Sequence, residues 1–239
     1  MINYQFPSKL IVSCQAPSDS PLYEPVVIAA MAQAAVNQGA AGVRIDTPAH
    51  IAAVRSRIVS PIIGIWKQVL PGFEVYITPR FEDAAAIAAA GADIIAIDAT
   101  ARNRPNGETL KTLIARIHSE LGKPVMADAD TLETAINAVE AGADAVATTL
   151  YGYTAATQHL SPPGFELLAQ MVEKLDVPVI CEGGIGGPLM AKEALDLGAF
   201  AVVVGTDITG IDLKVKAYNS VIGNGYCDRI KFPVQGSEY

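Results

Sequence analysis

The fold of this chain is decided by the stretch Gly39-Ala40-Ala41-Gly42-Val43-Arg44, which recurs three times in altered form. The later versions are Gly91-Ala92-Asp93-Ile94-Ile95, Gly142-Ala143-Asp144-Ala145-Val146 and Gly198-Ala199-Phe200-Ala201-Val202. Their first glycines stand 52, 51 and 56 residues apart. A period in this range predicts an array of repeated structural units.

A second series of short apolar runs alternates with the first. It occupies residues 10–15, 61–67, 124–128 and 178–182, and each run ends on a polar or ionisable side chain. Three of the four begin with proline, which is tolerated at the first residue of a strand but not within its hydrogen-bonded ladder. The segments in between repeat apolar residues at spacings of three and four, which indicates helices. We therefore predict a single (β/α)8 TIM barrel of class α/β, with a parallel eight-stranded core.

The length of 239 residues is close to the roughly 250 that are typical of such a barrel. We expect one barrel domain over residues 1–222, because Gly223-Asn224-Gly225 interrupts the helical pattern. Residues 223–239 would form a C-terminal tail. Two roles stay open for this tail, which either docks on the barrel or on another subunit, or is a frayed terminus.

Composition excludes several classes of protein. No apolar run approaches the roughly 18 residues of a membrane span, and the first nine residues do not resemble a secretory signal. Three cysteines without metal-type spacing favour a reduced cytoplasm. The net charge of −8 disfavours nonspecific binding of nucleic acid. A small anion that is held locally fits better.

The residues at the carboxyl ends of barrel strands line the active-site mouth. This rule selects a group of polar side chains: Gln15, Arg44, Lys67, Asp98, Asp128, Thr148, Thr149 and Glu182. Lys67 follows an apolar strand, where apolar walls and neighbouring charges can shift its protonation. We predict that Lys67 is catalytic, and the alternative is a solvated surface lysine. Asp98 either binds substrate hydroxyls or pairs with a loop arginine, whereas Asp130 is expected to cap a helix.

Glycines follow the seventh and eighth strands, the usual phosphate site of barrel enzymes. The seventh loop reads Gly183-Gly184-Ile185-Gly186-Gly187-Pro188, and the eighth begins Gly205-Thr206. Glycine lets backbone amides approach an anion closely, and the helix that follows favours negative charge. We predict a phosphate cradle around Gly184, Gly186, Gly205 and Thr206. Tyr153 in the sixth loop is either a pocket wall or an exposed loop aromatic. The scattered histidines predict neither a metal site nor a Ser, His and Asp triad.

Several short sequence motifs occur in a fixed order along the chain. They are Pro61-Ile62-Ile63-Gly64 with Lys67, Val75-Tyr76-Ile77-Thr78-Pro79, Asp98-Ala99-Thr100, Arg104-Pro105, Met126-Ala127-Asp128, Ala147-Thr148-Thr149-Leu150, Gly152-Tyr153-Thr154, Glu182-Gly183, and Val203-Val204-Gly205-Thr206 with Ile208-Thr209. With these motifs in this order, the chain resembles the N-acetylmannosamine-6-phosphate 2-epimerase family, from about residue 10 to residue 208.

The resemblance implies an isomerase that inverts carbon 2 of an N-acetylhexosamine 6-phosphate by moving a proton, within sialic acid catabolism. It implies no cofactor and no metal, a phosphosugar as the small-molecule partner, and a possible homodimer. Lys67 and Glu182 would be the catalytic pair, with their acid and base duties undivided. The sugar and its acetamido group would be held by Gln15, Arg44 and Asp128, with Thr149 and Tyr153 also expected to bind substrate.

One departure from the family pattern concerns the eighth loop. Relatives usually carry arginine after Ile-Thr, whereas here Gly210 follows Ile208-Thr209. Arginine binds phosphate in a bidentate manner that backbone amides do not match. Lys214 or Lys192 would supply the missing charge, the glycine loops would suffice alone, or the ligand lacks the 6-phosphate.

Three other functions stay open at this point. The first is a noncatalytic barrel that binds a phosphosugar, which the altered eighth loop favours and the retained Lys67 and Glu182 oppose. The second is an epimerase of an altered or unphosphorylated amino sugar. The third is a different phosphate-binding barrel enzyme, such as a lyase or isomerase of a ribose-derived intermediate, which rests on fold analogy alone.

Overall fold

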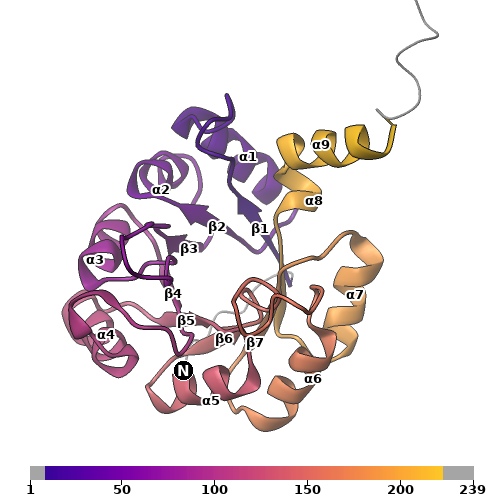
Figure 1. The fold of residues 1–239 in the computed structure, drawn as a ribbon. Helices are drawn as coiled ribbons and strands as arrows, with labels where there is room; N and C mark the ends of the chain where they lie inside the picture. Colours follow the sequence, from indigo (N-terminus) through magenta and orange to yellow (C-terminus); the bar gives the residue numbers. More distant parts are fainter. Residues whose placement is uncertain (1–8, 223–239) are drawn as a thin grey trace, which may run out of the picture.

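A computed structural model describes residues 9–222 of the chain, and it is a closed barrel (Figure 1). Eight parallel strands pair in sequence order from β1 round to β8, which closes on β1. Their bounds are β1 Leu10–Cys14, β2 Gly42–Asp46, β3 Ile62–Ile65, β4 Ile94–Asp98, β5 Val125–Asp128, β6 Ala145–Ala147, β7 Val179–Glu182 and β8 Ala201–Val204. The predicted (β/α)8 TIM barrel is confirmed.

Helices follow the strands and form the outer ring (Figure 1). They are α1 Pro25–Asn37, α2 Pro48–Arg55, α3 Phe81–Ala89, α4 Leu110–Arg116, α5 Leu132–Glu140, α6 Phe165–Lys174, α7 Pro188–Asp196, α8 Thr206–Thr209 and α9 Ile211–Ile222. The eighth strand is thus followed by two helices where the sequence predicted one. The predicted tail, residues 223–239, lies outside the described residues. Among residues 9–222, no helix has the length and apolarity that a membrane crossing requires.

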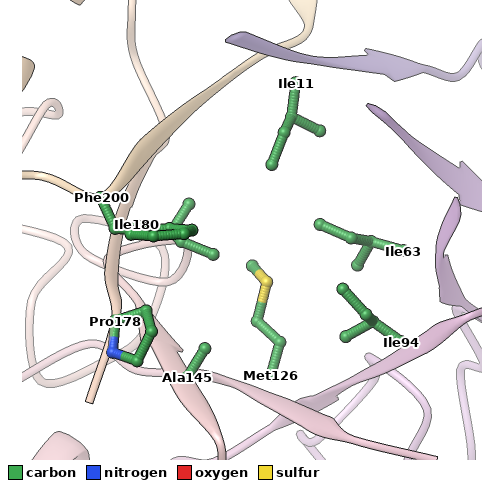
Figure 2. A pocket seen from close by; sticks show the side chains of 8 residues that line it. All are labelled: Ile11, Ile63, Ile94, Met126, Ala145, Pro178, Ile180 and Phe200. Atoms are coloured by element: carbon green, nitrogen blue, oxygen red, sulfur yellow. The ribbon is translucent and has the colours of Figure 1, made fainter. Parts of the chain in front are cut away.

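Side-chain alternation divides the core into two layers. Along each strand one set of residues packs outward against the helices, and the alternate set fills the barrel interior. The interior set is apolar at the amino ends of the strands. Figure 2 shows a cavity there, and its walls are Ile11, Ile63, Ile94, Met126, Ala145, Pro178, Ile180 and Phe200. The eight described residues that line this cavity are all apolar, whereas the ionisable side chains at the ends of β2, β4, β5 and β7 lie at the opposite end of the barrel.

Two strand ends differ from the sequence prediction. Strand β2 does not stop at Arg44 but continues to Asp46, because Ile45 and Asp46 pair with Gly64 and Ile65 of β3. Arg44 therefore lies inside the barrel and not at its rim. Strand β3 ends at Ile65, and Lys67 beyond it forms an isolated antiparallel bridge with Ile77.

Candidate active site

The interior positions change from apolar to polar toward the carboxyl ends of the strands. Most of these polar residues stand two places after an apolar or small interior residue, and Asp46 stands two places after Arg44, so their side chains point into the same space. This polar layer contains Ser13, Gln15, Arg44, Asp46, Lys67, Asp98, Asp128, Thr149 and Glu182. The structure therefore brings the predicted residues Gln15, Arg44, Lys67, Asp128, Thr149 and Glu182 into one mouth.

Arg44 is the centre of this layer. Its Nη1 and Nη2 atoms donate to the two carboxylate oxygens of Asp128 at 3.1 and 2.6 Å, and both side chains are fully buried. Nη1 also donates to Glu182 Oε2 at 3.0 Å. Burial alone would lower the pKa of Arg44, but the two carboxylates raise it overall. Arg44 thus joins β2, β5 and β7 through one permanently charged group.

Glu182 is the carboxyl group whose protonation is most altered. Burial raises its pKa to about 7, although the nearby charge of Arg44 acts in the opposite direction. The main chain of Glu182 is held by Thr148, which directly follows β6. Thr148 Oγ1 donates to the Glu182 carbonyl at 2.9 Å and accepts from the Glu182 N–H at 3.1 Å. Near neutral pH, Glu182 is therefore present in both its acidic and its basic form.

Lys67, which follows β3, lies across the mouth from Glu182 of β7. Its ammonium reaches solvent and donates to Gln15 Oε1 at 2.5 Å, and Gln15 in turn donates to Ser13 at 2.8 Å. Burial of the surrounding site lowers the pKa of Lys67, and the charge of Asp46 opposes this shift. The pKa of Lys67 is thus lowered and that of Glu182 is raised, and both shifts bring the groups closer to the neutral range in which proton transfer is efficient.

The other predicted substrate residues differ in how they are held. Thr149 donates to Asp128 Oδ1 at 2.7 Å, so it belongs to the Arg44 cluster. Tyr153 is 56% exposed, and its ring lies 3.7 Å from the place that a Cβ atom of Gly183 would occupy. It therefore lies beside the seventh loop as an exposed aromatic, and its role as a pocket wall stays a prediction.

Sequence reasoning missed Asp46 and Tyr76. Burial, followed by the charges of Asp128 and Asp98, raises the pKa of Tyr76 to about 12. Its hydroxyl therefore stays protonated beside the carboxylates of the mouth. Alternation along β2 would have found Asp46, which stands two residues after Arg44, but nothing in the sequence places Tyr76 there.

The two ambiguous aspartates turn out to be structural. Asp98 is fully buried and accepts from Thr100 at 2.7 Å and from Arg102 Nη2 at 2.7 Å, so it pairs with a loop arginine. The cap predicted for Asp130 is wrong, because the helix α5 begins after Thr131. Asp130 instead accepts from Thr134 at 2.9 Å and Thr154 at 2.6 Å, which ties the sixth loop to α5.

The glycines of the predicted phosphate cradle follow β7 and β8. Gly184 has a φ of +69°, and a Cβ there would lie 2.6 Å from Pro162, so no larger residue fits. Gly205 leads into α8, whose first residue is Thr206, and it packs against Ser13 of β1. The eighth loop is further pinned by Thr209 Oγ1, which donates to the Ser13 carbonyl at 2.8 Å.

Gly210 ends α8 in a tight turn. A Cβ atom at this position would lie 2.7 Å from Thr206 Cα and 2.8 Å from its carbonyl oxygen. Of the two lysines considered as substitutes for arginine, Lys192 binds Asp196 one turn along the exposed face of α7. Lys214 instead binds Asp207 of α8, directly beside the cradle.

Known proteins match this chain over most of its length. The family described as "Putative N-acetylmannosamine-6-phosphate epimerase" matches residues 28–224. The chain belongs to this family. Within it, a relative from Thermosynechococcus vestitus is 68% identical over 209 residues, covering 87% of this chain and 91% of its own length. A relative from Synechococcus elongatus is 61% identical over 211 residues, with the same two coverages.

A solved structure of the same family has the same fold. It is the N-acetylmannosamine-6-phosphate 2-epimerase from Clostridium perfringens, which is 42% identical, with a TM-score of 0.86. The match covers 90% of this chain and 93% of that one. The family resemblance of the sequence is therefore confirmed at the level of the fold and over almost the full length of both chains.

Proposed function

We propose that this protein is an isomerase that interconverts N-acetylmannosamine 6-phosphate and N-acetylglucosamine 6-phosphate by inversion at carbon 2. The observation that carries the proposal is the pair of Lys67 and Glu182 in one barrel mouth, with pKa values shifted toward each other. Membership of the epimerase family supports it. A barrel that only binds its ligand has no need of such a pair, which argues against the receptor alternative.

In the proposed reaction the sugar ring opens first, so that carbon 2 stands beside the aldehyde of carbon 1. The Lys67 amine takes the proton from carbon 2, and the electron pair of that C–H bond moves into the carbonyl to give an enolate. Return of a proton to the opposite face of carbon 2 yields the other epimer. Glu182 either assists ring opening or serves as the acid and base partner of Lys67. The number of electrons and protons in the sugar is unchanged.

We assign binding of the sugar and its acetamido group to Gln15, Arg44 and Asp128, together with Thr149 and Tyr153. Gln15 supports this assignment best, because its amide contacts the Lys67 ammonium directly. Arg44 contributes first by holding Glu182, and Asp128 by accepting from the Arg44 guanidinium. The exposed ring of Tyr153 is free to cover a sugar face.

For the phosphate we propose the backbone around Gly184, Gly186, Gly205 and Thr206. Lys214 would add the positive charge that arginine supplies in relatives, because its partner Asp207 belongs to the helix that begins at Thr206. Lys192 is less suited, since it pairs with Asp196 on the outer surface of α7.

The proposal extends to the setting of the enzyme. We place it in the cytoplasm and in sialic acid catabolism; Cys14 and Cys181 are buried free thiols, which suits a reducing compartment. A homodimer is also proposed. None of the residues of α9 is buried, and the helix leads away from the barrel (Figure 1). It exposes Leu213, Tyr218 and Val221, which a second copy would cover.

The experiment that tests the function incubates the protein with N-acetylmannosamine 6-phosphate in deuterated water, followed by NMR. We expect deuterium at carbon 2 together with the gluco epimer. Lys67→Met should abolish both, and the unphosphorylated sugar should react more slowly. Binding without exchange would establish the receptor alternative instead. Equal rates with and without the phosphate would establish an epimerase of an unphosphorylated sugar.

A further inference from the structure

Asp46 is a mouth residue to which no role has been given. It ends β2 two residues after Arg44, so its side chain points into the same interior space. Its Oδ1 atom accepts a hydrogen bond from the backbone N–H of Lys67 at 3.0 Å. The carboxylate therefore crosses from the end of β2 to the segment that carries the lysine.

The segment of Lys67 is also held from its other side. Lys67 pairs with Ile77 in an antiparallel bridge. Trp66 donates its N–H to Thr78 Oγ1 at 3.1 Å and accepts from the Thr78 N–H at 2.9 Å. Thr78 is fully buried, with a φ of 45°, a strained conformation for a β-branched residue. Such strain persists only where the surroundings fix the backbone firmly. Asp46 thus completes a clamp and is not the sole anchor of the segment.

The ammonium of Lys67 is left free of direct carboxylate contact. Its hydrogen bond goes to the neutral amide of Gln15, and within residues 9–222 no carboxylate forms an ion pair with it. A carboxylate in contact would compete with the substrate for the lysine. A carboxylate that binds the lysine's main chain provides negative charge nearby and leaves the amine accessible.

We propose that Asp46 is a positioning residue for Lys67, which fixes the lysine main chain by its hydrogen bond and balances the lysine charge from a short distance. This inference rests on the proposed catalytic role of Lys67. It adds a residue to the site that neither the sequence pattern nor the phosphate cradle requires.

The charges around both groups give the direction of the effect. Burial lowers the pKa of Lys67; Asp46 raises it, Arg44 lowers it, and Glu182 and Asp128 raise it. Burial raises the pKa of Asp46, and the backbone hydrogen bonds from Lys67 and Thr47 oppose that shift, as do the charges of Lys67 and His50. Tyr23 lies nearby. Among the charges that favour the protonated form of Lys67, that of Asp46 has the largest effect on the pKa. Its removal must therefore lower the pKa of Lys67 further.

Two substitutions separate the two parts of the proposal. Asp46→Asn keeps an oxygen acceptor for the Lys67 N–H but removes the charge, whereas Asp46→Ala removes both. The measurement is the rate of deuterium exchange at carbon 2 as a function of pH. In both variants we expect the ascending limb of the profile, along which the Lys67 amine loses its proton, to move to lower pH. Only Asp46→Ala should also lose maximal rate, by up to about 10²-fold, because the lysine is misplaced.

The control is Asp196→Asn on the outer surface of α7, which removes the same charge outside the mouth. Its profile should coincide with that of the parent protein. An unmoved or raised limb in Asp46→Asn, or an equal shift in Asp196→Asn, would overturn the proposal. Thermal unfolding of each variant verifies that it folds.

A second measurement keeps this inference separate from the proposed function. NMR titration of the Lys67 side-chain carbon reports its protonation without any substrate. We expect Asp46→Asn to lower the midpoint of that titration. If the parent protein fails to epimerise the sugar while the midpoint still moves, the function is wrong and the charge relationship holds. If the midpoint stays in place, the inference fails whatever the activity.

Discussion

The Arg44 guanidinium holds both oxygens of the Asp128 carboxylate, at 3.1 and 2.6 Å, in the fully buried centre of the barrel mouth. This bidentate geometry is available to arginine but not to lysine. A third hydrogen bond runs from the same guanidinium to Glu182. The orientation of the proposed catalytic carboxyl group thus depends on a pair of residues that belong to other strands.

Replacement of Arg44 by Met should therefore destabilise the protein as well as inactivate it. It leaves the buried Asp128 charge without a cationic partner, with only the Thr149 hydroxyl still donating to it. Breaking a buried ion pair from one side costs about 3–5 kcal/mol. Chemical denaturation measures this loss. The double variant Arg44→Met, Asp128→Leu should recover part of the stability but none of the activity, because Glu182 is still unsupported. An unchanged denaturation midpoint in Arg44→Met would contradict the central role of the pair.

Glu182 should make stability depend on pH in a defined window. Its pKa is raised from 4.5 to about 7, so the folded protein binds more protons than the unfolded chain between these values. The free energy of unfolding must then fall as the pH rises through this window. Glu182→Gln, which cannot titrate, should flatten this part of the curve. Unfolding midpoints measured at several pH values test it, and identical curves for both proteins would refute the assignment.

The fold and most of the mouth could be predicted from the sequence, because strand ends and glycine loops leave local patterns. Asp46 was missed because the predicted β2 ended at Arg44, although the alternation of Val43, Arg44, Ile45 and Asp46 continues; pairing with β3 extends the strand. The two hydrogen bonds that Arg44 donates to Asp128 could not be predicted from the sequence either. They join residues 84 positions apart, and either residue alone suggests a substrate contact.

Lys214 should contribute to recognition of the phosphate. Lys214→Met removes the positive charge and leaves Asp207 beside the cradle, so the KM for the phosphorylated sugar should rise while kcat changes less. Lys192→Met is the matched control, because that lysine pairs with Asp196 on the exposed face of α7. Steady-state kinetics of both variants decides the question. If Lys214→Met and Lys192→Met have equal KM values, Lys214 does not bind the phosphate.

Gly210 should be intolerant of any side chain. Gly210→Ala places a Cβ at 2.7 Å from Thr206 Cα, and overpacking of this kind costs about 1–3 kcal/mol. Gly187→Ala is the control, since no atom lies within 4 Å of its Cβ position. Thermal unfolding should separate the two variants. A Gly210→Ala protein as stable as the control would show that the turn can open.

That crowded turn also bears on how the site changes through evolution. An arginine at position 210 would meet the Thr206 backbone before its guanidinium could reach any ligand. This position therefore cannot gain a cationic side chain in one step unless the turn itself changes. Selection for tighter anion binding should act on neighbouring positions of α9 and leave Gly210 unchanged.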